Sequence, residues 1–92
     1  MNQPVEHATV YFSGHVQGVG FRYTALQVAK EFEVAGFVKN MTDGRVLLEL
    51  EGCGAEVDAY IAGVVDQMQG FVKKIERTQQ KRPAVFQGFE IR

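Results

Sequence analysis

The sequence predicts an α+β domain in which two helices pack on one face of an antiparallel sheet. Two observations support this prediction. Apolar and polar residues alternate in several short segments, as in half-buried strands, and apolar residues recur every three or four positions in two longer segments, as in amphipathic helices. These segments follow the order β-α-β-β-α-β with a short extra strand at the end. That order is typical of a ferredoxin-like α/β sandwich.

The N-terminal part contains the first predicted strand and the first predicted helix. The strand covers residues 8–13, after a loose polar tail over residues 1–6. A loop over residues 14–20 follows. An amphipathic helix of roughly three turns is expected to begin near Arg22. Gly36 is a natural stop for this helix.

A hairpin is predicted in the middle of the chain. Residues 37–40 and 45–51 are strand-like, and the Asp43-Gly44 pair between them favours a tight turn. The second helix follows, with an apolar stripe over residues 57–68. Gly63 lies inside that helix, where it indicates close packing on the sheet.

The C-terminal part is expected to complete the sheet. A strand covers residues 71–78, and a bulge near Lys73-Lys74 would reconcile its imperfect alternation. Residues 79–83 read as a polar loop. Residues 85–92 then form a short edge strand. The chain of 92 residues is therefore expected to be a single domain.

Composition restricts the partners. The formal net charge is −1 and the isoelectric point is about 6.1, which argues against a nucleic-acid or anionic-membrane partner. Cys53 is the only cysteine, so neither an intramolecular disulfide nor a cysteine metal cluster is possible. Neither a signal-peptide pattern nor a long apolar run occurs. We therefore expect a cytoplasmic monomer without metal or other cofactor.

The segment Gly14-His15-Val16-Gln17-Gly18-Val19-Gly20-Phe21-Arg22 has the pattern of an anion site. A glycine-bearing loop between a strand and a helix turns several backbone N–H groups toward one point, where phosphate binds well. Arg22 carries a planar fork of donors that matches phosphate oxygens. A cation at the start of a helix opposes the helix dipole, which suggests that an anion lies between them. An ordinary turn with a solvated arginine is the alternative.

These nine residues resemble the acylphosphatase signature Gly-x-Val-Gln-Gly-Val-x-Phe-Arg at every fixed position. A second stretch resembles the other signature of that family: Gly36-Phe37-Val38-Lys39-Asn40, then Gly44, Val46 and Gly52 at the expected spacing. The resemblance implies a ferredoxin-like hydrolase that splits acyl phosphates into a carboxylate and orthophosphate. Orthophosphate and sulfate are then expected to compete with the substrate.

The resemblance also implies roles for individual residues. Loop residues would cradle the phosphate, Arg22 would clamp it, and Asn40 would orient the attacking water. The cradle residues carried over from the family are His15, Val16, Gln17, Gly18 and Val19. The His15 position varies in the signature, so its side chain is expected to be exposed and not catalytic. Gln17 and Val19 are expected to shape the loop.

Two other functions fit the same fold. One is a non-catalytic module that binds a small anion or a protein partner, because fold alone does not determine function. The other is an acylphosphatase-like domain detached from a larger carbamoyl-transferring protein, which the end of the chain at Arg92 makes less attractive. RNA binding is disfavoured, since the aromatic pattern of RNA-recognition sheets is absent.

Overall fold

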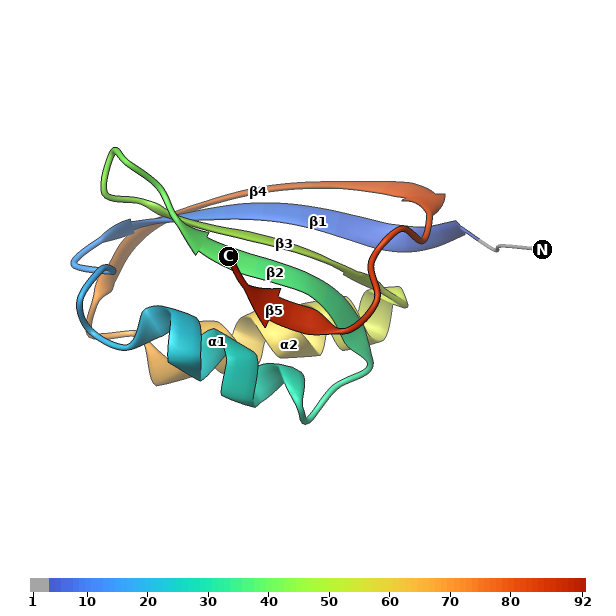
Figure 1. The fold of residues 1–92 in the computed structure, drawn as a ribbon, viewed down its shortest axis with the longest axis horizontal. Helices are drawn as coiled ribbons and strands as arrows, with labels where there is room; N and C mark the ends of the chain where they lie inside the picture. The colour runs from blue at the N-terminus through green and yellow to red at the C-terminus, as the bar shows by residue number, and fades with distance from the viewer. Residues whose placement is uncertain (1–3) are drawn as a thin grey trace.

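A five-stranded sheet lies over two helices in the computed structural model, which describes residues 4–92 (Figure 1). Both helices cover the same face of the sheet, as predicted. In chain order the elements are β1 (Pro4–Gly14), α1 (Phe21–Ala29), β2 (Val34–Asn40), β3 (Val46–Gly52), α2 (Gly54–Gln67), β4 (Val72–Pro83) and β5 (Phe89–Ile91).

The strand order is β4-β1-β3-β2-β5, and the sheet is mixed. The prediction of an antiparallel sheet is correct for the first four strands and wrong for the last. β5 pairs with β2 in parallel, with Gly36 opposite Phe89. The direction follows from the connection, because the last residues of β4 lie at the same end of the sheet as the first residues of β2. The chain crosses over there and then runs alongside β2 (Figure 1).

β1 and β4 are both longer than predicted. Residues 4–6, expected in a loose tail, and residues 79–83, expected in a polar loop, pair with each other from Pro4–Pro83 to Ala8–Gln79. Both predictions are wrong because these segments are mostly polar and show no alternation, while backbone hydrogen bonds still hold them as strands. Residues 1–3 of the expected tail lie outside the described part of the chain.

The predicted bulge lies at Lys73. Ser13 pairs with Lys74 and Gly14 with Val72, so Lys73 is the extra residue. Gly14 has a φ of 125°, and a Cβ there would lie 2.5 Å from the Phe71 carbonyl oxygen. The bulge therefore brings the start of the loop after β1 tightly against the start of β4.

Gly36 does not stop the first helix. α1 ends at Ala29, where the Lys30 N–H donates to the carbonyl oxygen of Gln27 and the Glu31 N–H to that of Val28. Gly36 lies inside β2 with a φ of 156°, where a Cβ would lie 1.9 Å from the Glu49 carbonyl oxygen. The glycine thus allows β2 and β3 to approach closely. The Asp43-Gly44 turn of the same hairpin forms as predicted.

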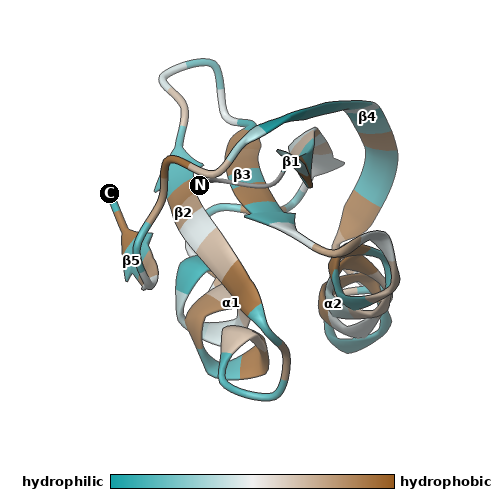
Figure 2. Cartoon of the chain, turned by 90° about the vertical axis from the view of Figure 1, so that its right-hand side faces the viewer, coloured by the Kyte–Doolittle hydropathy of each residue, from teal (hydrophilic) through white to brown (hydrophobic). Residues whose placement is uncertain are grey.

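The core lies between the sheet and the helices and is made of hydrophobic residues from both layers. Figure 2 shows hydrophobic residues in the strands and in the two helices. The Tyr60 hydroxyl is buried there and donates to the Ala25 carbonyl oxygen at 2.8 Å, which joins α2 to α1. Gly63 also faces α1 rather than the sheet, since a Cβ there would lie 3.1 Å from Val28 Cγ1. The prediction that Gly63 packs on the sheet is therefore wrong. The strand residues of this core cluster are Ala8, Val10, Phe12, Val38, Val46, Leu48 and Leu50.

Candidate active site

The loop between β1 and α1 is held by its side chains. Val16 is buried in the core, and Val19 packs against it. Gln17 Nε2 donates to the carbonyl oxygens of Met41 (2.8 Å) and Arg45 (3.0 Å). Gln17 therefore ties the loop to the hairpin between β2 and β3. The structure agrees with the predicted loop-shaping role of Gln17 and Val19.

His15 stands at the start of this loop. Its backbone N–H donates to the Phe71 carbonyl oxygen at 2.9 Å, and its exposed ring lies beside the Phe71 ring. The N–H group is thus engaged within the protein. Both features set His15 apart from the rest of the loop.

The next five N–H groups, those of residues 16–20, are available to a ligand. Within residues 4–92 they donate neither to a backbone carbonyl nor to a side chain. Gly18 and Gly20 have φ values of 78° and 79°. Such a left-handed conformation is easy for glycine and turns successive N–H groups to one side. Gly20 is also the N-cap of α1, so the positive end of the helix dipole lies at the same place.

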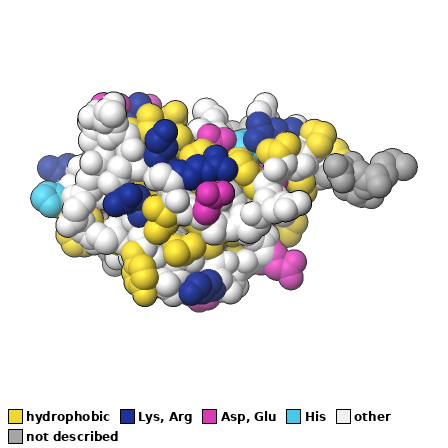
Figure 3. Space-filling model, viewed as in Figure 1, with side chains coloured by type: hydrophobic (Ala, Val, Ile, Leu, Met, Phe, Trp, Pro, Cys, Tyr) yellow, Lys and Arg dark blue, Asp and Glu magenta, His cyan; other side chains and the backbone are white. Residues whose placement is uncertain are grey.

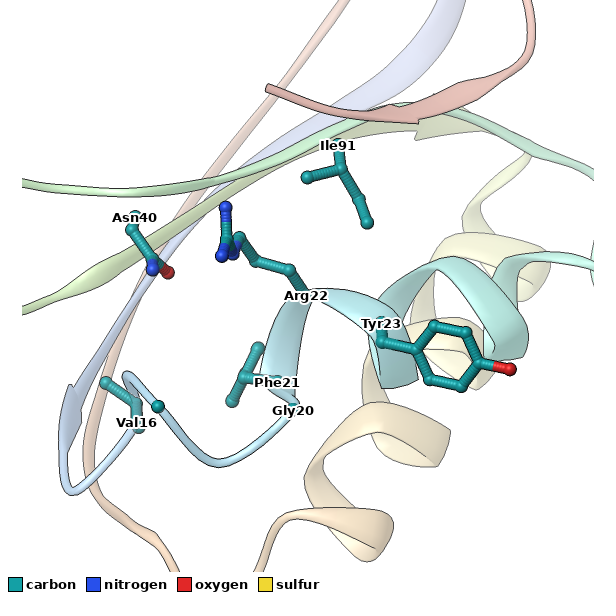
Figure 4. A pocket seen from close by; sticks show the side chains of 8 residues that line it. Val16, Gly20, Phe21, Arg22, Tyr23, Asn40 and Ile91 are labelled. Carbon is teal, nitrogen blue, oxygen red and sulfur yellow. The ribbon is translucent and has the colours of Figure 1, made fainter.

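Arg22 and Asn40 meet at this loop. They line one pocket of about 250 Å³, in which Asn40 comes from the end of β2 and Arg22 from the first turn of α1. Figure 4 shows the side-chain amide of Asn40 beside the guanidinium of Arg22. Asn40 Oδ1 is buried, and within the described residues it accepts no hydrogen bond. A buried carbonyl oxygen of this kind can accept a hydrogen bond from a ligand or a water molecule.

The electrostatics of the pocket favour an anion. The first turn of α1 contains no acidic residue, and Arg22 forms no ion pair within residues 4–92. The carboxylate of Asp43, in the turn after β2, does not line the pocket and is paired with the N–H and the side chain of Arg45. These contacts hold the pKa of Asp43 below its usual value. The unpaired positive charge of the pocket therefore belongs to Arg22 and the helix end.

The pocket gathers four of the predicted site residues, namely Val16, Gly18, Arg22 and Asn40. His15, Gln17 and Val19 do not line it. Sequence reasoning did not assign a site role to the remaining lining residues, Gly20, Phe21, Tyr23 and Ile91. Gly20 and Tyr23 are the direct neighbours of the Phe21-Arg22 pair of the signature, so their position in the sequence could have indicated that they lie at the site. Ile91 lies far from both signatures, and no sequence pattern indicated it.

Residues 4–92 contain no group of three or more His, Cys, Asp or Glu residues arranged to hold a metal ion. Nor is either helix long and apolar enough to cross a membrane.

Comparison with known proteins identifies the family. The acylphosphatase family model matches residues 8–91. An acylphosphatase of Methanospirillum hungatei is 30% identical, with 96% of this chain aligned to 98% of that protein. One of Archaeoglobus fulgidus is 46% identical over 60% of this chain, and the chain spans 62% of its length. The crystal structure of acylphosphatase from Bacillus subtilis superposes with a TM-score of 0.84 at 30% identity, covering 94% of this chain and 97% of that one. Acylphosphatases are hydrolases that act on an acid anhydride. The two signatures, the sandwich fold and these matches together show that the chain belongs to the acylphosphatase family.

Proposed function

We propose that this chain hydrolyses acyl phosphates to a carboxylate and orthophosphate, with Arg22 and Asn40 as the catalytic residues. The observation that carries the proposal is that both side chains line one pocket with a loop whose N–H groups are free. Groups that can donate to an anion and an amide that can orient a water molecule therefore lie around one small volume. This is the arrangement that the chemistry of an acyl phosphate needs.

The phosphate would lie against the loop. The N–H groups of residues 16–20 and the guanidinium of Arg22 would donate to its oxygens. The N–H of His15 already donates to the Phe71 carbonyl oxygen, so we confine the phosphate cradle to residues 16–20. These donors stabilise the charge on the equatorial oxygens, which is the main requirement of phosphoryl transfer.

Asn40 would position the attacking water. Its Oδ1 is buried without a partner and can accept a hydrogen bond from that water. The water oxygen bonds to phosphorus as the bond from phosphorus to the acyl oxygen breaks, and a carboxylate leaves. An oxygen of the transferred phosphate takes the proton of the water. No strong base is required, since a carboxylate leaves without being protonated.

A metal ion is not needed in this mechanism. The charge of the phosphate is met by Arg22 and by the dipole of α1, and the leaving group is a weak base. We therefore propose metal-independent hydrolysis. We also propose that the chain acts as a monomer in the cytoplasm; its single cysteine leaves no intramolecular disulfide and fits a reducing compartment.

Hydrolysis of benzoyl phosphate, followed by its ultraviolet absorbance, tests this proposal. We expect turnover that survives exhaustive chelation and is inhibited competitively by orthophosphate and by sulfate. Lys81→Ala is a suitable control variant, because Lys81 pairs with Glu6 at the other end of β1 and β4. Orthophosphate binding without turnover would favour the binding-module alternative. Activity lost in EDTA and restored by magnesium would refute the metal-free mechanism.

A further inference from the structure

The pocket has an apolar part that the phosphate and the water do not use. Tyr23, which follows Arg22 in α1, and Ile91 of β5 both line it. Their exposed fractions are 64% and 40%, although both are large hydrophobic residues. Single exposed hydrophobic residues are common on protein surfaces. Two of them lining the same small pocket is a more specific arrangement. Figure 3 shows hydrophobic side chains beside Lys and Arg side chains on the face where α1 and β5 lie.

The positions of these two residues fit the geometry of the reaction. In phosphoryl transfer the attacking and leaving oxygens lie roughly in line, on opposite sides of phosphorus. Figure 4 shows Asn40 on one side of Arg22 and Ile91 and Tyr23 on the other. If Asn40 holds the water and Arg22 holds the phosphate, as proposed above, the acyl group leaves away from Asn40, on the side of Arg22 where Ile91 and Tyr23 lie.

We propose that Tyr23 and Ile91 form an acyl-group subsite that selects apolar, preferably aromatic, acyl phosphates over small ones such as acetyl phosphate. This inference rests on the proposed function. A flat acyl group can pack against the Tyr23 ring and the Ile91 side chain and shield part of both from water.

The size of the preference follows from the exposure of the subsite. A closed apolar pocket discriminates between ligands that differ by one methylene by about 10-fold to 200-fold. Here both residues stay partly in water. The lower end of that range is therefore expected, so removal of the Tyr23 ring should lower the preference for benzoyl over acetyl phosphate by about 10-fold.

The test compares kcat/KM for benzoyl phosphate and acetyl phosphate in each protein. The ratio of the two values does not depend on how much of a variant is correctly folded. The informative variants are Tyr23→Ala, Tyr23→Phe and Ile91→Thr. Val85→Ala is the matched control, because Val85 is also 64% exposed and does not line the pocket.

We expect the benzoyl-to-acetyl ratio to fall in Tyr23→Ala and in Ile91→Thr. It should stay at the wild-type value in Tyr23→Phe, which keeps the ring, and in Val85→Ala. The inhibition constant of orthophosphate should stay within about 3-fold of wild type in all four, because the subsite does not touch phosphate. An unchanged ratio in Tyr23→Ala and Ile91→Thr, or an equal loss for both substrates, would overturn the subsite. If the wild-type chain hydrolysed neither benzoyl phosphate nor acetyl phosphate, the proposed function itself would be refuted.

Discussion

Asn40 and Arg22 line the same pocket, although one is the last residue of β2 and the other lies in the first turn of α1. Two separate contacts hold this relationship. Gln17 ties the loop before α1 to the hairpin that follows Asn40. Val16 and Val19 pack the same loop onto the core. The site is therefore built on the sheet, on a helix start and on a fastened loop, which gives it the rigidity that positioning catalysis needs.

Replacement of Arg22 should remove the phosphate clamp. Arg22→Ala is expected to lose both turnover and orthophosphate affinity, because the guanidinium would contact phosphate in the ground state and in the transition state. Arg22→Lys should not restore activity, since an ammonium group cannot form the bidentate contact. We expect kcat/KM for benzoyl phosphate to fall by roughly 10²-fold or more in both variants. Activity of Arg22→Lys within about 3-fold of wild type would show that only the charge matters.

Replacement of Gln17 should loosen the loop. Gln17→Leu keeps much of the side-chain bulk but removes the amide that donates to Met41 and Arg45. At about 0.5–1.5 kcal/mol for each of the two hydrogen bonds, the free energy of unfolding should fall by about 1–3 kcal/mol. Urea denaturation measures this loss, and orthophosphate affinity should decrease as well. Gln69→Leu, an exposed position after α2, controls for the added apolar surface. Full phosphate affinity in Gln17→Leu would mean that the loop holds its shape without this tie.

Tyr60 should make the protein unstable at high pH. Burial raises the pKa of the Tyr60 phenol far above its ordinary value. The folded state therefore keeps the proton above pH 10, whereas the unfolded chain releases it. Stability is complete below about pH 10 and should decrease by up to about 1.4 kcal/mol per pH unit above it. In urea denaturation, the difference in unfolding free energy between wild type and Tyr60→Phe should change by about 1.4 kcal/mol in total between pH 9 and pH 11. A difference that stays constant across the range would show that the phenol is not kept protonated by burial.

The two hairpin glycines should differ in their tolerance of a side chain. Gly36→Ala would place a Cβ 1.9 Å from the Glu49 carbonyl oxygen, so the backbone of β2 or β3 would have to shift. Gly44 has a φ of 96° and open space around it. Gly44→Ala should therefore cost only its backbone strain, about 1–3 kcal/mol. Thermal denaturation should show the larger loss for Gly36→Ala. Equal losses in the two variants would show that the hairpin accommodates the extra atom.

The loop and Arg22 could be predicted from the sequence because a glycine-bearing turn between strand and helix is a local feature. The other parts of the pocket depend on contacts between distant segments. Ile91 reaches the pocket only because β5 crosses to β2 and pairs with it in parallel. The N–H of His15 is engaged because the bulge at Lys73 brings the Phe71 carbonyl oxygen close to it. The full length of β4 could not be predicted either. Its polar residues show no apolar alternation, because pairing with the backbone of β1 holds them in the strand conformation.

The division of labour between Asn40 and Arg22 is the central claim, and the Asn40→Ala variant tests it most directly. Its turnover of benzoyl phosphate and its dissociation constant for orthophosphate, by calorimetry, should be measured on one preparation. Turnover should fall by roughly 10²-fold or more, the scale of a lost positioning group. The dissociation constant should stay within a few-fold of wild type, because Asn40 would touch only the water. Near-normal turnover, or loss of phosphate binding as complete as in Arg22→Ala, would contradict the account.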